Sequence, residues 1–247
     1  MASATNATQV VDLLSEKARL AARTLIAASE QERSEALIKI AEEIEKSVIE
    51  ILAANKEDME RAKSEGMQES LQDRLLLSEP RVHAIADGPR QVSKLPNPLG
   101  KTIRENTLPN GLHLRQITVP FGVVGMVYEA RPNVTVDAAV ILLMSGNAAL
   151  LRGSSSADAS NKVLVDVMRR ALSKTAISPD VIQIIPSDDR STVHALLNAR
   201  GKVDLVIPRG SSNLIRTVVD ESTVPTIETG AGVCHVYIDE YADLAKA

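Results

Sequence analysis

From Gly122 onward, short apolar runs alternate with helical patterns, and this alternation constrains the fold more than any other feature of the sequence. Apolar runs indicate strands at residues 123–128, 148–151, 181–185, 203–207 and 224–227. Helical patterns lie between them, at residues 134–144, 157–172, 192–199 and 214–219. Strands of continuous Val, Ile and Leu that alternate with helices are typical of a parallel sheet covered on both faces. The sequence therefore predicts an α/β fold with a Rossmann-type parallel sheet, which binds ligands at the carboxyl ends of its strands.

The segment before residue 101 shows helical spacing and predicts leading helices. Ser29 and Glu32 have the spacing of a capping box, and an apolar stripe follows them, so we predict one long helix from this point. An earlier helix is indicated by the apolar spacing between Val10 and Leu25, and a later one between residues 78 and 96. The stripe of the long helix consists of Leu37, Ile40, Ala41, Ile44, Val48, Ile51 and Leu52.

Residues 101–119 predict a protruding β-hairpin. Two runs of β-forming residues flank Pro109-Asn110-Gly111, and Asn-Gly between such runs signals a tight hairpin turn. A hairpin in this place either extends a sheet or grips another subunit, and we favour an oligomerisation arm. The chain then divides into leading helices at 1–100, the hairpin at 101–119, a Rossmann-like core at 120–232 and the start of a further connection at 233–247.

Composition and charge argue against several classes of function. The net charge is −4 and aromatic residues make up 2% of the chain, so neither charge nor stacking surfaces favour a nucleic-acid partner. The apolar runs are shorter than a membrane span, and the first residues lack the pattern of a signal peptide. We expect a cytoplasmic protein without a membrane or metal site. The single cysteine, Cys234, lies in a run, 234–238, that predicts a strand, and we expect it to be a buried core residue.

Two strand exits pair an arginine with glycine and serines just before a helix. These are Arg152-Gly153-Ser154-Ser155-Ser156 and Arg209-Gly210-Ser211-Ser212. Glycine lets the backbone approach a phosphate, while serine hydroxyls, amides at a helix start and a guanidinium donate to it. The sequence lacks both the G-x-G-x-x-G fingerprint and the P-loop motif. The pair of exits predicts a phosphorylated ligand, and the added positive charge favours a nucleotide with a 2′-phosphate.

Three long motifs in order carry a resemblance to a known family. They are VPFGVVGMVYEARPNVTVDAAVILLMSGNAALLRGSSSA, DLVIPRGSSNLI and VPTIETGAGVCHVYID. The sequence resembles the gamma-glutamyl phosphate reductase (glutamate-5-semialdehyde dehydrogenase) family, within the aldehyde dehydrogenase superfamily. The resemblance implies an aldehyde-dehydrogenase-like fold and the second step of proline biosynthesis. In that step NADPH reduces L-glutamyl 5-phosphate to glutamate 5-semialdehyde, with release of phosphate, through a covalent cysteine intermediate.

The resemblance also implies roles for residues at the strand exits. Asn133 matches the asparagine that holds the developing oxyanion, and Glu228 matches a glutamate that activates water in hydrolytic relatives, although a reductase needs no such water. Arg131 is a candidate for the substrate carboxylate or phosphate. The implied NADPH-binding residues are Arg152, Gly153, Ser154, Ser155, Arg209, Gly210, Ser211 and Gly230. A homo-oligomer is implied, with glutamate 5-kinase as a further candidate partner.

Each of these residues also has an ordinary structural interpretation. Asn133 is suited to capping the following helix. Arg152 is compatible with a surface ion pair to Asp158, and Arg131 with one to Glu129. The segment Arg209-Gly210-Ser211 also fits a plain loop between a strand and a helix.

The family's nucleophile belongs to a later motif, similar to Gln-Arg-Pro-Ser-Val-Cys-Asn. Residues 244–247 read as the start of a helix, so we expect a chain that stops before the catalytic cysteine and does not itself reduce glutamyl phosphate. Two further functions stay open: a non-catalytic NADP-binding or self-associating protein, and a related dehydrogenase acting on another acyl donor. The segment Glu-Ala-Arg-Pro-Asn-Val-Thr favours the glutamyl phosphate family over the second of these.

Overall fold

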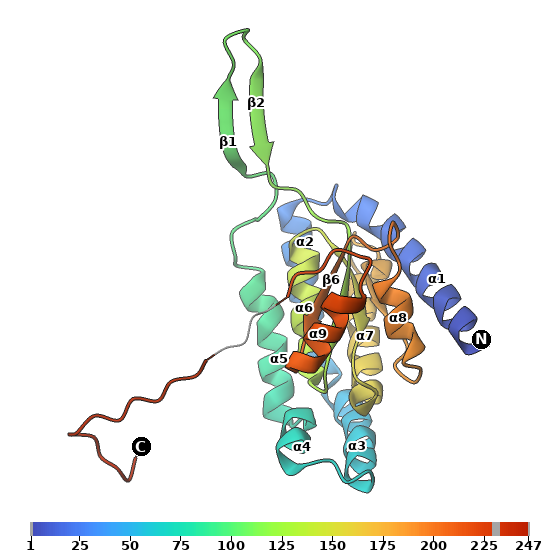
Figure 1. Cartoon of the computed structure of the whole chain (residues 1–247), viewed down its shortest axis with the longest axis vertical. Coiled ribbons are helices and arrows are strands. Elements are labelled where there is room, and N and C mark those ends of the chain that lie inside the picture. Colours follow the sequence, from blue (N-terminus) through green and yellow to red (C-terminus); the bar gives the residue numbers. More distant parts are fainter. Residues whose placement is uncertain (1, 229–232, 247) are drawn as a thin grey trace.

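A computed structural model of the chain describes residues 2–228 and 233–246. Leading helices pack beside a parallel sheet, and a thin hairpin stands away from both (Figure 1). The leading helices are α1 (Ala2–Leu25), α2 (Glu30–Lys46), α3 (Val48–Ser64), α4 (Glu69–Leu75) and α5 (Glu79–Val92). The remaining elements, apart from the hairpin, are β3 (Val123–Tyr128), α6 (Pro132–Met144), β4 (Ala148–Arg152), η1 (Ser155–Ala157), α7 (Asp158–Leu172), η2 (Pro179–Val181), β5 (Ile182–Ile184), α8 (Ser191–Leu197), β6 (Leu205–Arg209) and α9 (Ser212–Glu221).

The capping box predicted at the start of α2 is confirmed. The Ser29 hydroxyl accepts from the Glu32 amide at 3.2 Å, and the Glu32 carboxylate accepts from the Ser29 amide at 2.7 Å. Hydrogen bonds to the Glu32 carboxylate from the Ser29 amide and from the Ser29 hydroxyl lower the pKa of Glu32. The single long helix predicted for this stripe is wrong, because the backbone leaves the helical region at Ser47 (φ −103°, ψ 14°) and divides it into α2 and α3.

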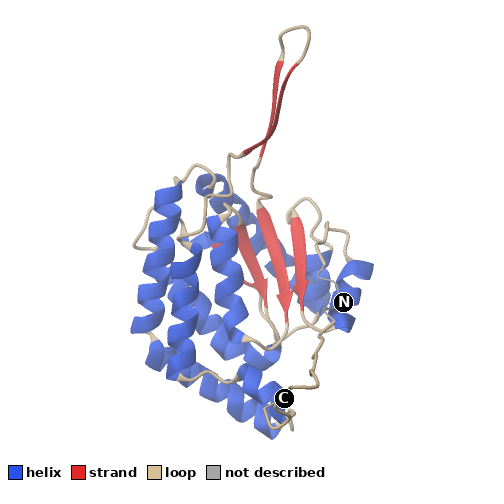
Figure 2. Cartoon of the chain, turned by 90° about the vertical axis from the view of Figure 1, so that its left-hand side faces the viewer, coloured by secondary structure: helices blue, strands red, loops and turns tan. Residues whose placement is uncertain are grey.

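The four described strands of the sheet are parallel and run in the order β5-β4-β3-β6. The chain moves outward from β3 through β4 to β5, then returns to the other side of β3 with β6. Because such crossovers are right-handed, α6 and α7 cover one face, and α8 covers the opposite face after the reversal. Figure 2 shows the strands enclosed between helical layers. The reversal point lies between the carboxyl ends of β3 and β6, where sheets of this kind bind ligands.

The leading helices complete both layers around the sheet. Helix α1 packs against β3, β4, β5 and α8, while α2, α3 and α5 form an outer layer over α6 and α7. One continuous apolar core joins these helices to the sheet, with large side chains such as Leu37, Ile44, Leu150 and Leu164 fully buried. The short helix α4, which no sequence pattern indicated, packs through Leu75 onto α3 and η1 in a separate small cluster.

The strand predicted at residues 224–227 is reduced to one bridge at the outer edge of β6, between Val206 and Thr226. Val206 donates to the carbonyl of Pro225 at 2.9 Å, and Ile227 donates back to Val206 at 3.2 Å. Pro225 has no amide hydrogen to extend the ladder, which explains why pairing stops there.

The strand predicted at residues 234–238 is wrong, and so is the expectation of a buried cysteine. Residues 233–238 have no strand partner, and the Cys234 thiol is exposed. Residues 244–246 form a turn rather than the start of a helix, and Ala247 lies outside the described residues. A β-strand needs a neighbouring strand to pair with its backbone N–H and C=O groups. Residues 233–238 extend away from the rest of the protein and have no such neighbour (Figure 1).

The predicted hairpin is confirmed as β1 (Thr102–Thr107) and β2 (His113–Ile117), which pair antiparallel. The Leu108 amide donates to the Leu112 carbonyl at 2.9 Å, so three residues form the loop, and Gly111 adopts a positive φ of 83°. Pro109 at the first loop position and glycine in the left-handed region suit a type I turn with a bulge. Every residue of both strands is exposed.

Candidate functional site

A hollow of about 290 Å³ lies at the topological reversal between β3 and β6. The residues that follow these two strands form most of its wall, and helix α4 contributes one arginine. The lining residues are Arg74, Tyr128, Glu129, Arg131, Val134, Arg209, Gly210 and Ser211. The structure thus brings Arg131 together with three of the residues predicted to bind the cofactor.

The exit after β6 is open to solvent. The exposed Arg209 guanidinium has neither a hydrogen bond nor an ion pair within the described parts of the chain. Ser211 caps α9 by accepting from the Leu214 amide at 3.4 Å, and its own amide donates to Glu129 at 2.9 Å. A Cβ on Gly210 would come within 2.6 Å of the Glu129 carboxyl carbon, so the absence of a Cβ permits this close approach of the Glu129 side chain.

The exit after β3 holds Arg131 and Asn133. Arg131 is the N-cap of α6, so Asn133 lies inside the helix, and the interpretation of Asn133 as a capping residue is wrong. The Asn133 amide nitrogen donates to Asp137 at 3.0 Å, and the other hydrogen on that nitrogen remains available to a ligand. Burial raises the pKa of Asp137, with the bond from Asn133 acting in the opposite direction. The alternative ion pair between Arg131 and Glu129 is not formed in the described structure.

A second hollow of about 460 Å³ adjoins this exit, between α4, α5 and α6. Asn133 and Asp137 line one side of it, and Asp73 and Arg81 line the other. Arg74 and Arg131 line both hollows, so they stand between the reversal point and Asn133. Sequence patterns gave no signal for Arg74, because α4 has only seven residues and shows no clear apolar period.

The exit after β4 is closed by the protein itself. Arg152 is only 8% exposed, and its guanidinium donates to the carbonyls of Gly153 (2.9 Å), Ser187 (3.3 Å) and Asp189 (3.3 Å). Burial lowers the pKa of Arg152, and the neighbouring charge of Arg190 adds to the effect. The alternative surface pair with Asp158 is wrong, since the Asp158 carboxylate instead accepts from Lys162 (2.6 Å) and from Ser187.

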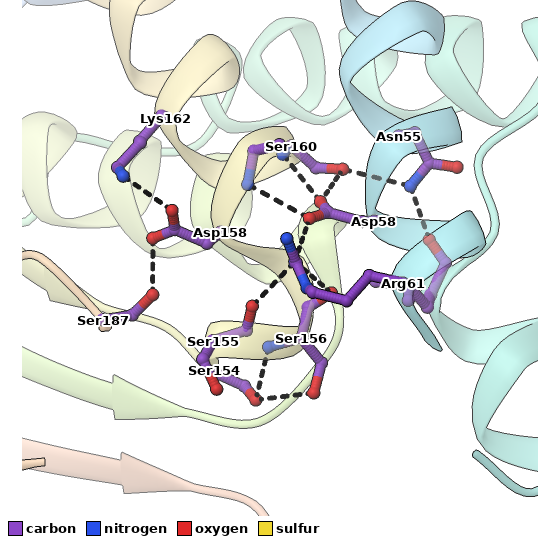
Figure 3. A network of polar contacts seen from close by, with 12 residues as sticks. Asn55, Asp58, Arg61, Ser154, Ser155, Ser156, Asp158, Ser160, Lys162 and Ser187 are labelled. Atoms are coloured by element: carbon purple, nitrogen blue, oxygen red, sulfur yellow. Dashed lines mark hydrogen bonds and ion pairs between the residues drawn. The ribbon is translucent and has the colours of Figure 1, made fainter. Parts of the chain in front are cut away.

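A polar network from α3 occupies the helix start after β4 (Figure 3). The fully buried Asp58 accepts from the amides of Ala159 (3.2 Å) and Ser160 (2.8 Å), and it pairs with Arg61. Arg61 also donates to the Ser155 carbonyl at 2.9 Å. Because the Asp58 carboxylate already accepts from the amides of Ala159 and Ser160 at the positive end of α7, these two amides are not free to bind a phosphate.

Gly153 and Ser154 have structural partners at the same exit. A Cβ on Gly153 would overlap Asn161 and approach the Tyr128 ring, so the position allows only glycine. The Ser154 hydroxyl caps η1 by accepting from the Ser156 amide at 3.2 Å. The assignment of Arg152, Gly153, Ser154 and Ser155 to the cofactor stays a prediction. The contacts observed for Arg152, Gly153 and Ser154 are with other residues of the protein.

A buried hydrogen-bond chain that the sequence did not indicate joins the two exits. The Tyr128 hydroxyl meets Thr135 at 2.8 Å, and Thr135 donates to Asn161 at 2.7 Å. Burial raises the pKa of Tyr128, which stays protonated and hydrogen-bonded to Thr135 on α6, and Thr135 connects it to Asn161 on α7. This chain ties the end of β3 to α6 and α7, and so fixes the back wall of the hollow.

Of the two remaining predicted site residues, the structure describes only Glu228. Glu228 is exposed, just beyond the bridge at Thr226, and Gly230 lies outside the described residues. Within the described ranges, no set of His, Cys, Asp and Glu side chains could hold a metal ion. No helix in these ranges combines the length and apolar character needed to span a bilayer.

Comparison with known proteins places the chain among aldehyde dehydrogenases and their relatives. A sequence model of the aldehyde dehydrogenase family matches residues 1–247. Gamma-glutamyl phosphate reductases of Thermobifida fusca (strain YX) and Kineococcus radiotolerans are each 52% identical, over 95% and 94% of this chain and 56% and 54% of their own lengths. The crystal structure of gamma-glutamyl phosphate reductase from Thermotoga maritima superposes with a TM-score of 0.87 at 42% identity, over 94% of this chain and 56% of that one. The chain spans about half the length of the curated relatives it matches.

Proposed function

This chain belongs to the aldehyde dehydrogenase family, and we propose that it is the cofactor-binding part of an NADPH-dependent gamma-glutamyl phosphate reductase. The whole enzyme reduces L-glutamyl 5-phosphate to L-glutamate 5-semialdehyde and phosphate, the second step of proline biosynthesis. The observation that carries the proposal is the hollow at the reversal between β3 and β6, lined by Arg209, Gly210 and Ser211. Its relatives at 52% identity are named for that enzyme.

The residues at the β6 exit suit a nicotinamide dinucleotide. Gly210 has no Cβ, and the exposed Glu129 side chain lies where a Cβ would stand, while Ser211 caps the first turn of α9. Arg209 offers a guanidinium that no described residue has taken. Together these groups would hold the pyrophosphate, because glycine, amides and an arginine fork are the elements that bind phosphate closely. When bound, NADPH supplies a hydride.

The adenosine side of NADPH is assigned to the β4 exit, with Arg152, Gly153, Ser154 and Ser155. The closed state of that exit limits how it can act. Arg152 shapes the loop at residues 187–189 by donating to its carbonyls. We propose that it supports a 2′-phosphate through its charge and through the position of this loop, with Ser154 and Ser155 nearest to the ligand.

The substrate is assigned to the side of Arg131 and Asn133. The Asn133 amide is oriented by Asp137, and its remaining hydrogen would donate to an oxygen that gains negative charge in the reaction. Arg131 would hold an anionic group of the substrate. Glu228, near the same edge of the sheet, and Gly230 are assigned to the nicotinamide end.

Self-association through the hairpin is part of the proposal. The hairpin exposes Ile103, Leu112, Leu114 and Ile117, between 47% and 63% each, on an arm without contact to the body. Burial of such side chains by a second copy would remove apolar surface from water. A homo-oligomer is therefore proposed, and association with glutamate 5-kinase stays a prediction.

NADPH binding by this chain tests the proposal. Cofactor fluorescence is titrated with protein, with NADH as the comparison ligand and with Arg209→Ala and Arg216→Ala as variants. Arg216 lies exposed on α9, outside both hollows, and also lacks a partner among the described residues. Arg216→Ala therefore changes the net charge by the same amount as Arg209→Ala. We expect saturable binding that prefers NADPH, weakened about tenfold by Arg209→Ala alone. A folded chain that does not bind NADPH, or equal effects of both substitutions, would overturn the assignment.

A further inference from the structure

We infer that Arg74, on the helix α4 that the sequence did not indicate, acts with Arg131 to bind the phosphate group of an acyl phosphate. The inference rests on the proposed function for the identity of the substrate. Arg74 lies outside the three motifs that carry the family resemblance, and it would bind the same phosphate group as Arg131. Both residues line the hollow at the reversal point and the hollow beside Asn133.

The backbone around Arg74 is held on both sides, which fixes where its side chain begins. Arg81 donates to the carbonyl of Asp73 at 2.6 Å, one residue before Arg74. Buried Asn55 donates to the carbonyl of Leu75 at 2.9 Å and accepts from the Leu77 amide at 2.7 Å. Leu75 itself is fully buried. A short helix in a surface position needs such anchors to present one side chain reproducibly.

The carboxylates that line the two hollows already have protein donors. Asp73 accepts from Arg81 at 2.8 Å, Asp137 from Asn133 at 3.0 Å, and Glu129 from the Ser211 amide at 2.9 Å. Arg74 and Arg131 have no acidic partner among the residues that the structure describes. Two guanidiniums that form no ion pair with a described residue, and that line the same two hollows, favour an anionic ligand with several acceptor oxygens, as in a phosphate group.

The position of Arg74 and Arg131, which line both hollows, favours the acyl phosphate over the cofactor as their ligand. Arg209, Gly210 and Ser211 lie on the β6 side of the first hollow, and Asn133 lies in the second. A substrate whose carbonyl oxygen meets Asn133 would have its leaving group beside this carbonyl, between the two hollows. Arg74 and Arg131 would then bind the phosphate in the substrate and stabilise the charge it gains on leaving.

Inorganic phosphate, the product of the proposed reaction, is the probe. Its binding to the chain is measured by titration calorimetry at constant ionic strength, with and without saturating NADPH. We expect saturable phosphate binding that persists with NADPH present. Arg74→Ala and Arg131→Ala should each weaken it about tenfold, because a hydrogen bond to a charged group is lost. Arg216→Ala, which removes an exposed arginine outside both hollows, should leave it unchanged.

The outcomes separate this inference from the proposed function. Phosphate that competes with NADPH occupies the cofactor's own site, and this result would overturn the inference while leaving the proposed function intact. Equal affinity in the unmodified chain and in Arg74→Ala would also overturn it, as would absence of saturable binding. Phosphate binding that depends on Arg74 in a chain that does not bind NADPH would sink the proposed function and keep the anion site. Circular dichroism of each variant verifies that it is folded.

Discussion

The exits after β4 and β6 carry nearly the same sequence and have opposite structures. Both read Arg-Gly-Ser-Ser before a helix. After β4, Arg152 is buried and donates to three carbonyls, whereas after β6, Arg209 is exposed and unpartnered among the described residues. The comparison teaches that a phosphate-binding motif describes only the groups a chain can offer. Whether those groups face a ligand depends on what other elements cover them.

The covering element at the β4 exit is α3. Asp58 accepts from amides at the start of α7, and Arg61 donates to the carbonyl of Ser155, so residues of α3 occupy these groups (Figure 3). No described helix of the outer layer reaches the β6 exit in the same way, and a hollow remains.

Removal of the carboxylate that closes the β4 exit should have the largest effect. Asp58→Ala leaves two amides of α7 and the Arg61 guanidinium without their partner, and should lower the free energy of unfolding by about 3 kcal/mol. Urea unfolding measures this change. The control is Asp166→Ala, which removes an exposed acid on α7 without a partner among the described residues and should change stability by less than about 0.5 kcal/mol. Equal effects of the two substitutions would contradict the closed exit.

The two arginines should differ in their contribution to stability. Arg152→Met keeps the length of the side chain and removes its donors, which leaves the buried carbonyls of Gly153 and Ser187 unpaired and should cost about 2 kcal/mol. Arg209→Met changes an exposed side chain and should cost less than about 0.5 kcal/mol. The difference between their urea midpoints is the measurement. If Arg209→Met destabilises the chain as much, the β6 exit is not open.

The two glycines allow the same comparison on the backbone. Gly153→Ala brings a Cβ against Asn161 and the Tyr128 ring in the core, and should destabilise the chain by about 1.5 kcal/mol. Gly210→Ala brings it against the Glu129 side chain, which can swing toward solvent, so the expected cost is below about 0.5 kcal/mol. Thermal unfolding of the two variants side by side decides between these outcomes.

The smallest expected effect is on the pH dependence of stability, where two part-buried aspartates act oppositely. Hydrogen bonds from Lys162 and Ser187 outweigh burial and lower the pKa of Asp158, so its contribution exists above about pH 4 and is lost as the pH falls. Burial raises the pKa of Asp137 near the open exit, so its contribution exists below about pH 4 and is lost as the pH rises through the raised value.

Unfolding in urea at several values between about pH 3 and pH 6 tests these signs. Asp137→Asn should remove a decrease of stability with rising pH, and Asp158→Asn should remove an increase. If the free energy of unfolding changed with pH in the same way in both variants, the two aspartates would not have oppositely shifted pKa values.

Much of the fold followed from local sequence patterns. The apolar run at β3, the capping box of α2, and the proline and Asn-Gly of the hairpin turn were read correctly, because each depends on residues within a few positions of one another. Local patterns failed where pairing depends on distant segments. The segment at residues 234–238 has strand-forming residues, yet it lies exposed because no strand stands beside it.

Local sequence patterns were enough to predict the parallel α/β sheet, the hairpin and the chemical types of the residues at the strand exits. The packing of distant segments settles which exit is open, brings Asp58 to Ser160 across 102 positions, and makes Arg74 and Arg131 line the same two hollows. The physical reason is that backbone periodicity is satisfied within an element, whereas a charged side chain is free or paired according to groups that other elements bring to it.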